Sequence, residues 1–252
     1  MERTALPGRL SWQSGEVVAI RQETAHAKSL TLAVPQWAGH RAGQHVDIRL
    51  TAEDGYQVER SYSIASPPGV GQQIMLTVEL LNDGEVSPYL VEELRVGDKI
   101  ELRGPIGGYF VWEATMGGPL LLVAGGSGIV PLMAIVRHRS AVGSTVPTRL
   151  LVSARSYEEI IYRDELERLL VGDNGPEVIY TLTRSAPPTW TGYRRRIDAD
   201  LLREVAWSAA ARPLAYICGP TEFVETAATD LLALGYEAAR IKTERFGATG
   251  GT

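Results

Sequence analysis

The spacing of hydrophobic and polar residues changes near the middle of the chain. In the first half, short segments alternate or run apolar, and Gly, Pro, Asn and Asp fill the gaps, as in β-strands joined by tight turns. The expected strands cover residues 16–20, 29–34, 45–50, 60–65, 74–80 and 99–103. This pattern predicts a small antiparallel β-barrel. One helix is expected within it, at residues 87–94, where Leu90, Val91 and Leu94 recur at helical spacing.

Beyond a glycine-containing linker at residues 113–118, strands alternate with helices. Residues 120–124 form a continuous apolar run of the kind buried on both faces of a parallel sheet, and a helical pattern follows at 129–138. Further strands are expected at 149–153, 177–183, 214–218 and 241–246, and further helices at 158–170, 199–205 and 221–234. This order predicts a doubly wound α/β fold with ligands at the carboxyl ends of its strands. We therefore expect two domains, a barrel at residues 1–113 and an α/β domain at residues 119–252.

The composition fits two globular domains and excludes several functions. With 252 residues, 44% hydrophobic and 22% charged, the chain is long enough for two hydrophobic cores. A net charge of −5 argues against a nucleic-acid-binding protein, which needs a basic surface. The first ten residues lack the apolar segment of a secretion signal, and the longest apolar run, residues 119–124, is too short to span a membrane. We expect a cytoplasmic protein without nucleic-acid or membrane partners.

Cys218 is the single cysteine of the chain. It excludes an internal disulfide, a zinc ribbon and an iron-sulfur cluster with four cysteine ligands. No metal site is expected, and any iron-sulfur or haem centre in the same reaction has to belong to another molecule.

Two short motifs carry candidate chemistry. In the first, Arg60 offers a cationic fork for a pyrophosphate, Tyr62 an aromatic face for a flat ring, and Ser63 a small hydroxyl beside it. The alternative is that Tyr62 alternates with its neighbours as in any strand and packs in the core.

The second motif is a glycine-rich turn between a buried strand and a helix. The backbone of Gly126, Ser127 and Gly128 is open to a pyrophosphate, whose charge is met by the N-terminus of the helix that begins near Ile129 and Pro131. The third glycine of the usual dinucleotide fingerprint is absent, and Arg155 stands where an acidic residue would hold a ribose hydroxyl. A tight turn that serves only packing remains the alternative.

Taken in order along the chain, these motifs resemble the ferredoxin-NADP reductase superfamily. The resemblance extends to residues 84–87 (Gly-Glu-Val-Ser), 218–220 (Cys-Gly-Pro) and 244–246 (Glu-Arg-Phe), so it covers nearly the whole chain. It implies an FAD-binding barrel joined to an NAD(P)-binding α/β domain, with the isoalloxazine ring held between them.

The resemblance also implies roles for the barrel residues. Arg60 pairs with the FAD pyrophosphate, Tyr62 stacks on the isoalloxazine, and Ser63 hydrogen-bonds near flavin N5. The rest of the implied FAD site is Ser61, the strand ending at Glu79, and Gly84, Val86 and Ser87 at the start of the barrel helix. Ser87 at a helix start is equally well explained as an N-cap.

In the second domain, the resemblance implies that Cys218, followed by Gly219 and Pro220, lies beside the nicotinamide C4. Its role is to position the ring, without thiolate chemistry. Glu244 belongs to the same site, and Phe246 shields the flavin. A buried cysteine is otherwise a small apolar filler, and Phe246 an ordinary strand residue.

Three arginines bear on the coenzyme. Arg155, Arg184 and Arg196 follow expected strand ends, where their guanidinium groups suit a 2′-phosphate, so NADPH is favoured over NADH. The alternative is that they are solvated surface residues.

These parts predict an FAD-dependent NAD(P)H oxidoreductase. Hydride passes from the coenzyme to FAD, and the electrons go to a separate protein such as a ferredoxin, a flavodoxin or an oxygenase component. Two alternatives remain: a regulatory subunit that binds flavin or nucleotide without turnover, and a flavin reductase that releases free reduced flavin. Among the histidines, His45 in the strand before the flavin motif is the one to test.

Overall fold

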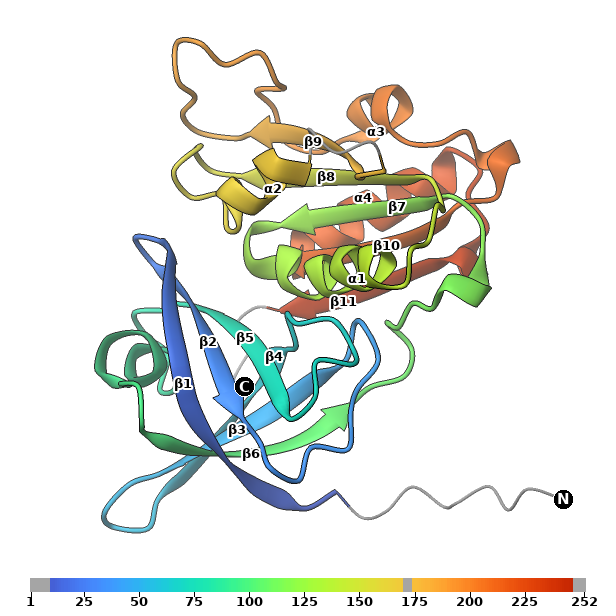
Figure 1. The fold of residues 1–252 in the computed structure, drawn as a ribbon. Helices are drawn as coiled ribbons and strands as arrows, with labels where there is room; N and C mark the ends of the chain where they lie inside the picture. The colour runs from blue at the N-terminus through green and yellow to red at the C-terminus, as the bar shows by residue number, and fades with distance from the viewer. Residues whose placement is uncertain (1–9, 170–173, 247–252) are drawn as a thin grey trace, which may run out of the picture.

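The computed structural model describes residues 10–169 and 174–246 of the chain (Figure 1). Most of the amino-terminal segment considered as a secretion signal, the expected helix end at residue 170 and the outer limits of both expected domains lie outside the described residues.

The first half folds into an antiparallel sheet of six strands, as the alternation predicts. The strands are β1 (Trp12–Thr24), β2 (Ala27–Ala33), β3 (His45–Thr51), β4 (Gln57–Ser63), β5 (Gln73–Glu79) and β6 (Lys99–Ile106), in the order β4-β3-β6-β1-β2-β5. An antiparallel bridge between Ile64 and Leu76 brings the end of β4 to β5 and closes the sheet into a barrel. Leu30, Ile48 and Leu76 fill its core.

The helix of the barrel is a single wide turn. It is the π-helix η1 (Tyr89–Glu93), in which the Leu94 amide donates to the Tyr89 carbonyl at 3.0 Å. Ser87 does not cap it; its hydroxyl accepts from the Leu81 amide at 3.0 Å. Ser87 therefore ties the start of this helix to the chain that leaves β5.

The second half is a parallel sheet of five strands. They are β7 (Leu120–Gly125), β8 (Thr148–Ala154), β9 (Glu177–Leu182), β10 (Leu214–Pro220) and β11 (Ile241–Phe246), in the order β11-β10-β7-β8-β9. The helices are α1 (Ile129–Ala141), α2 (Arg163–Leu169), α3 (Ala199–Val205) and α4 (Thr221–Ala233), with short 3-10 turns η2 (Ala114–Met116), η3 (Gly126–Gly128), η4 (Ala209–Ala211) and η5 (Ala238–Arg240). The chain order reverses between β7 and β10, which is where doubly wound sheets bind their ligands.

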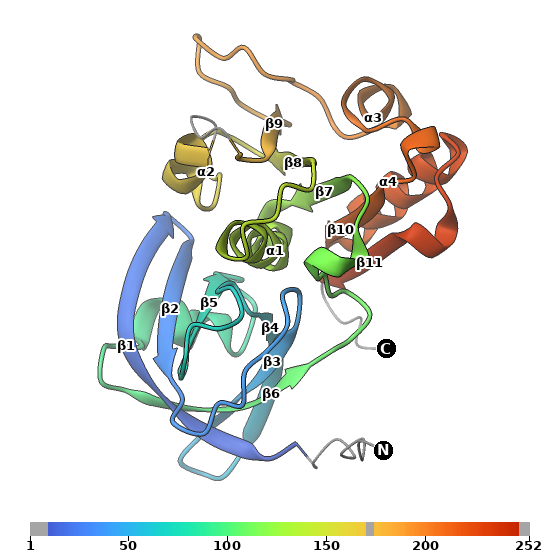
Figure 2. The ribbon, with the colours of Figure 1, turned by 45° about the vertical axis from the view of Figure 1, so that its right-hand side comes forward.

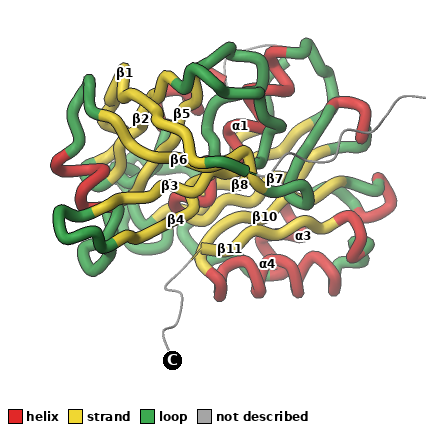
Figure 3. The backbone as a smooth tube through the Cα atoms, turned by 90° about the horizontal axis from the view of Figure 1, so that it is seen from below, coloured by secondary structure: helices red, strands yellow, loops and turns green. Residues whose placement is uncertain are grey.

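Helices cover both faces of this sheet (Figure 3). Leu120 and Leu122 of β7 belong to the hydrophobic cluster under α1, whereas Leu121 and Val123 belong to the one under α3 and α4. Both faces of β7 are therefore buried, which explains its uninterrupted apolar run.

Helix α2 begins later than the hydrophobic pattern predicts. The expected start was residue 158, but Tyr162 has a φ of +61° and cannot be part of a right-handed helix. The carbonyl of Tyr162 accepts from the Glu165 and Leu166 amides, both at 2.9 Å, so the helix starts after this residue. A non-glycine residue in this conformation costs about 1 to 2 kcal/mol, and tertiary contacts have to hold it.

The barrel packs against the α1 face of the parallel sheet (Figure 2). Ala42, Ala65 and Phe110 from the first half of the chain join the same buried cluster as Leu132 and Met133 of α1. Strand β6 ends at Ile106 and β7 begins at Leu120, so the expected linker at residues 113–118 lies between the two sheets.

Candidate functional site

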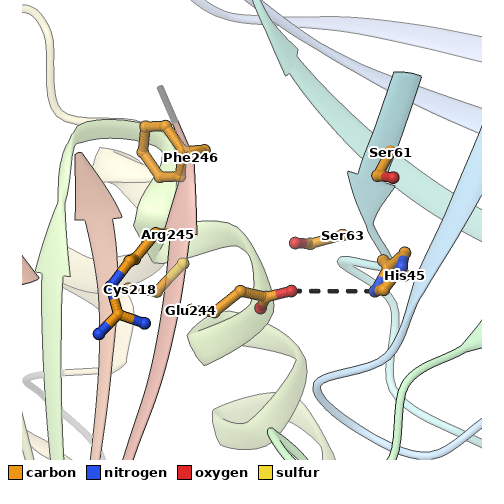
Figure 4. A pocket seen from close by; sticks show the side chains of 7 residues that line it. All are labelled: His45, Ser61, Ser63, Cys218, Glu244, Arg245 and Phe246. Atoms are coloured by element: carbon orange, nitrogen blue, oxygen red, sulfur yellow. Dashed lines mark ion pairs between the residues drawn. The ribbon is translucent and has the colours of Figure 1, made fainter. Parts of the chain in front are cut away.

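A cavity lies where the carboxyl ends of β10 and β11 face β3 and β4 of the barrel (Figure 4). Its volume is about 260 Å³, and it is lined by His45, Ser61, Ser63, Cys218, Glu244, Arg245 and Phe246. The three residues expected to be catalytic, Ser63, Cys218 and Glu244, thus meet in one place although 181 positions separate the first from the last. Neither sheet forms this cavity alone.

The barrel wall of the cavity comes from two paired strands. His45 of β3 is the register partner of Ser63 of β4, so both present their side chains at the same end of the barrel. Ser61, two residues earlier on β4, donates its hydroxyl to Asp47 Oδ1 at 2.7 Å.

Tyr62 is oriented differently from these two serines. It is half-buried against the barrel core and does not line this cavity. Burial raises the pKa of its phenol to about 12.

The opposite wall comes from two adjacent strands of the parallel sheet. Cys218 of β10 is the register partner of Glu244 of β11. Cys218 is 2% exposed, and burial together with the Glu244 charge raises the pKa of its thiol. Both effects favour the neutral thiol over the nucleophilic thiolate.

Glu244 reaches across the cavity toward the barrel. Its Oε1 lies 3.8 Å from Nδ1 of His45, beyond hydrogen-bond range, and its buried Oε2 has no hydrogen-bond partner among the described residues. Burial raises the pKa of Glu244 to about 7. Burial also lowers the pKa of His45, against the opposing pull of Asp47. The contact, drawn as a dashed line in Figure 4, is an ion pair only when His45 is protonated and Glu244 is ionised, and burial disfavours both charged forms.

The glycine-rich loop lies against the same strand end as Cys218. A Cβ on Gly128 would stand 2.0 Å from the Cys218 carbonyl oxygen, so only glycine fits there. Gly126 has a φ of +56° and is exposed, and a Cβ on it would lie 3.9 Å from the carboxylate of Glu79. Ile129 and Pro131 are buried in the first turn of α1. The loop is thus fixed on one side by β10 and open on the other at Gly126 and Ser127.

Gly219 is also held by close packing. The ring of Phe223 lies over it and over Gly125, since a Cβ on either glycine would come within 3 Å of that ring. Pro220, which follows, is exposed at the end of β10.

Arg60 lies on the barrel away from this cavity. Its guanidinium pairs with Glu85 at 2.9 Å, and Glu85 also accepts from the Tyr56 hydroxyl at 2.9 Å. Gly84 packs tightly in the neighbouring turn, where a Cβ would meet the Leu81 carbonyl and Ser87 Oγ at 3.1 Å. Val86 is buried there. The expected pyrophosphate residues are therefore grouped, and Glu85 stands among them.

Two of the three expected coenzyme arginines are neighbours. The Arg184 amide donates to the Arg155 carbonyl at 2.9 Å, which places both residues just beyond the carboxyl ends of β8 and β9. Arg196 lies in the loop before α3. All three are exposed, and within residues 10–169 and 174–246 none of their side chains makes an ion pair. Arg195, by contrast, is bound to Asp198 at 2.6 Å.

Sequence reasoning missed Glu85 and Arg245 and gave His45 no role. Glu85 stands inside the turn of residues 84–87, and an acidic residue among the residues expected to bind the pyrophosphate was the available signal. The position of His45 follows from strand pairing with Ser63, which no spacing along the chain reveals.

Comparison with known proteins decides the family. The FAD-binding domain of oxidoreductases matches residues 15–111, and the NAD-binding domain of oxidoreductases matches residues 122–229. Ferredoxin–NADP reductase B of Sorangium cellulosum is 36% identical over 182 residues, 71% of this chain and 73% of that protein. The chain belongs to the ferredoxin-NADP reductase superfamily.

Other members of the superfamily are similar over more of the chain. The glycine betaine monooxygenase reductase subunit of Chromohalobacter salexigens is 29% identical over 95% of this chain, and NADH-cytochrome b5 reductase 1 of Aspergillus terreus is 32% identical over 79%. The chain spans only 66% and 68% of the length of these two proteins. The FAD/NAD-binding domain of nitric oxide dioxygenase from Vibrio cholerae superposes with a TM-score of 0.83, at 25% identity, covering 93% of this chain and 98% of that one.

The superfamily consists of FAD-dependent NAD(P)H oxidoreductases, and the two-sheet fold matches it. In the described part of the chain, no helix has the length and apolar character needed to cross a membrane. Within the same residues, no three side chains of His, Cys, Asp or Glu are grouped as metal ligands.

Proposed function

We propose that this protein takes hydride from NADPH onto FAD held between its two domains, and passes the electrons to a separate redox protein. The observation that carries the proposal is the cavity that sets Ser63 of the barrel opposite Cys218 and Glu244 of the parallel sheet, beside the glycine-rich loop. A flavin and a nicotinamide have to be stacked for hydride transfer, and this cavity is where the two domains face each other.

The residues present fit FAD. Oε2 of Glu244 is buried in the cavity and lacks a partner among the described residues, which is costly unless a ligand supplies one. Arg60 is 48% exposed in its side chain and bound only by surface groups, so its fork is available to a pyrophosphate. When bound, FAD supplies the hydride acceptor and the route by which electrons leave in single steps.

The chain's own residues would position the two cofactors and hold a proton near them. Ser63 offers a hydroxyl at the barrel wall, and Cys218 would offer a small, neutral surface to a nicotinamide ring bound in the cavity. Glu244, with a pKa of about 7, holds or releases a proton at Oε2 near neutral pH. The packing of Gly128 against β10 fixes the pyrophosphate loop relative to Cys218, because reacting atoms have to approach to about 3 to 3.5 Å.

NADPH is favoured by the arginines at the sheet edge. Arg155 and Arg184 are joined by a backbone hydrogen bond and are exposed, and within the described residues neither guanidinium makes an ion pair, which suits a 2′-phosphate. The similarity to an NADH-cytochrome b5 reductase keeps NADH as the second candidate, since that name gives NADH as the coenzyme of that protein.

The acceptor is proposed to be a separate one-electron carrier. Similar proteins carry the names of reductase components for an oxygenase or of ferredoxin reductases, which supports this class of acceptor. These names give the acceptor class and do not choose among a ferredoxin, a flavodoxin and an oxygenase component.

The test is anaerobic mixing of the purified yellow protein with NADPH or NADH while flavin absorbance is followed. Fast bleaching by NADPH, slowed about tenfold or more at limiting coenzyme by Arg184→Ala, supports the proposal. Arg203→Ala is the matched control, because Arg203 pairs with Asp200 on the surface of α3. Bound flavin that stays oxidised with both coenzymes would identify a binding subunit without turnover, and protein that purifies without flavin would favour release of free reduced flavin.

A further inference from the structure

Strand β5 of the barrel has two buried faces. Ile74, Leu76 and Val78 point into the barrel core, and the alternate residues point at the parallel-sheet domain. Met75 packs on the cluster under α1, Thr77 is hydrogen-bonded to Tyr162, and the carboxylate of Glu79 lies near Gly126 of the glycine-rich loop. One strand therefore contacts both the barrel core and the coenzyme loop.

Tyr162 makes the central contact of this face. Its side chain is 1% exposed, and its hydroxyl lies 2.5 Å from Thr77 Oγ1, which lies 2.8 Å from Ser29 Oγ. Each hydroxyl has one proton, so the donor and acceptor of each hydrogen bond in this row of hydroxyls follow from the bond at its Ser29 end. Ser29 donates to the Glu23 carboxylate, which leaves Thr77 to donate to Ser29 and Tyr162 to donate to Thr77.

Glu23, the last acceptor in this row of hydrogen bonds, is also held in place. Glu23 is bound by Arg21 at 2.6 Å, at the tip of the β1–β2 hairpin that points toward α2 in both views (Figures 1 and 2). The hydroxyl relay therefore crosses from the start of α2 through β5 and β2 to β1.

Arg137 of α1 makes a second crossing beside the first. Its guanidinium lies 4.5 Å from the centre of the Tyr162 ring, pairs with Glu165 at 2.5 Å, and donates to the Ala65 carbonyl at 2.6 Å. Burial alone would raise the pKa of Glu165, but the Arg137 hydrogen bonds outweigh it and lower that pKa. We call these six residues, Ser29, Ala65, Thr77, Arg137, Tyr162 and Glu165, the interdomain clamp.

The clamp meets the barrel close to residues of the expected flavin site. Ala65 is two residues beyond Ser63, and Thr77 is two residues before Glu79. On the other side it holds α1, whose N-terminus carries Gly126–Gly128. The unusual backbone of Tyr162 has no local cause in the sequence, and the clamp supplies the contacts that hold it.

We propose that Tyr162 is a positioning residue for hydride transfer. Its hydroxyl, through Thr77, fixes the spacing between the glycine-rich loop (Gly126–Gly128) and the barrel strands β4 and β5. The inference rests on the proposed function. Tyr162 lies outside the cavity and touches neither reacting group, so it acts through Thr77 and Arg137. Small displacements of reacting groups reduce rates strongly while leaving binding almost unchanged.

The test compares Tyr162→Phe with Tyr236→Phe. Both tyrosines are buried and each donates one hydroxyl hydrogen bond, but Tyr236 donates to Trp207 within the parallel-sheet domain, at 2.7 Å. We expect Tyr162→Phe to slow the limiting rate of flavin reduction about five- to tenfold, weaken the long-wavelength charge-transfer absorbance of the coenzyme–flavin complex, and leave KM for NADPH within about twofold. Tyr236→Phe should leave all three as in the wild type.

Thr77 gives a second pair of variants that remains informative if Tyr162→Phe does not fold. Thr77→Val removes the acceptor hydroxyl and should slow reduction as Tyr162→Phe does, whereas Thr77→Ser retains it and should restore the wild-type rate. Because the two residues share one hydrogen bond, the combined variant should be no slower than the slower single one.

Amide hydrogen exchange of the FAD-free protein gives a readout apart from activity. Residues 158–166 should exchange about tenfold faster in Tyr162→Phe and not in Tyr236→Phe. An unchanged limiting rate and charge-transfer band in Tyr162→Phe, with the wild type active, would overturn this proposal alone. A wild-type flavin that neither coenzyme reduces would overturn the proposed function and this positioning role together.

Discussion

Cys218 and Glu244 are register partners on neighbouring parallel strands, so a thiol and a carboxyl group lie side by side at the carboxyl edge of the sheet. Burial raises the pKa of both groups, and the Glu244 charge adds to the effect at Cys218. In mildly acidic solution the edge therefore presents two neutral, protonated groups to the cavity.

The thiol of Cys218 should be unreactive in the folded protein. We expect a water-soluble disulfide reagent at pH 8 to modify it at least about 100-fold more slowly than free cysteine, because the thiolate is disfavoured and the sulfur is covered. In denaturant the single cysteine should react at once and with one equivalent. Rapid reaction of the folded protein would show an exposed thiolate and contradict the packing described.

Glu244 should make stability depend on pH in a defined direction. Its pKa is raised from 4.5 to about 7, so between these pH values the folded state binds a proton that the unfolded state has lost. The stabilisation that depends on this proton is complete below about pH 4.5. It is lost as pH rises through about 7, at a cost of up to about 3 kcal/mol. Glu244→Gln should therefore remove this loss and unfold at a higher temperature than the wild type above pH 7.

The measurement is thermal unfolding of FAD-free protein between pH 5 and pH 8. Glu222→Gln is the control, since Glu222 is an exposed carboxylate in the first turn of α4 and should leave the wild-type profile in place. Parallel pH profiles for the wild type and Glu244→Gln would show that the carboxyl group is not desolvated.

Gly128 should not tolerate a side chain. Its substitution by alanine puts a Cβ 2.0 Å from a backbone oxygen of β10, which cannot move aside as a flexible side chain can. Gly128→Ala is expected to cost about 3 kcal/mol or more in unfolding free energy. Gly108→Ala is the matched control, because nothing lies within 4 Å of the Cβ that it adds. Equal denaturation midpoints for the two variants would rule out the close approach.

Arg60 should contribute strongly to the affinity for FAD, and Glu85 should compete with the FAD pyrophosphate for the Arg60 guanidinium. Loss of a charge-assisted bond to a pyrophosphate predicts that Arg60→Ala weakens FAD binding about 10- to 100-fold. Glu85→Gln removes only an exposed ion pair. It should leave the affinity for FAD unchanged or raise it by at most about fivefold. Fluorescence titration of FAD-free protein measures both, and an Arg60→Ala variant with wild-type affinity would remove Arg60 from the proposed FAD site.

The sequence predicts the strands and most helices because their signals are local. β11 and α3 have the expected ranges, and α3 begins after Asp198, whose side chain accepts from the Leu201 amide as an N-cap. The meeting of Ser63, Cys218 and Glu244 was predicted through the resemblance, because spacing along the chain alone does not bring strands of two domains together.

Other features depend on tertiary contacts and leave no local signal. The start of α2 is set by Tyr162, whose side chain is held by Thr77 and Arg137 from distant elements. The sequence suggests Ser87 as an N-cap, but in the structure its hydroxyl accepts from the Leu81 amide. The turn that follows is a π-helix. The pairing of Arg60 with Glu85 arises where β4 meets the turn that follows β5.

The two-sided burial of β5 has a consequence for how the protein is made. The barrel emerges from the ribosome first, while the segments that cover Met75 and Thr77, α1 and α2, are still to be synthesised. Until then a strand with an apolar and hydroxyl-bearing outer face is open to solvent beside an unfinished domain. We therefore expect mispairing of β5 to compete with completion of the fold until α1 and α2 have been made.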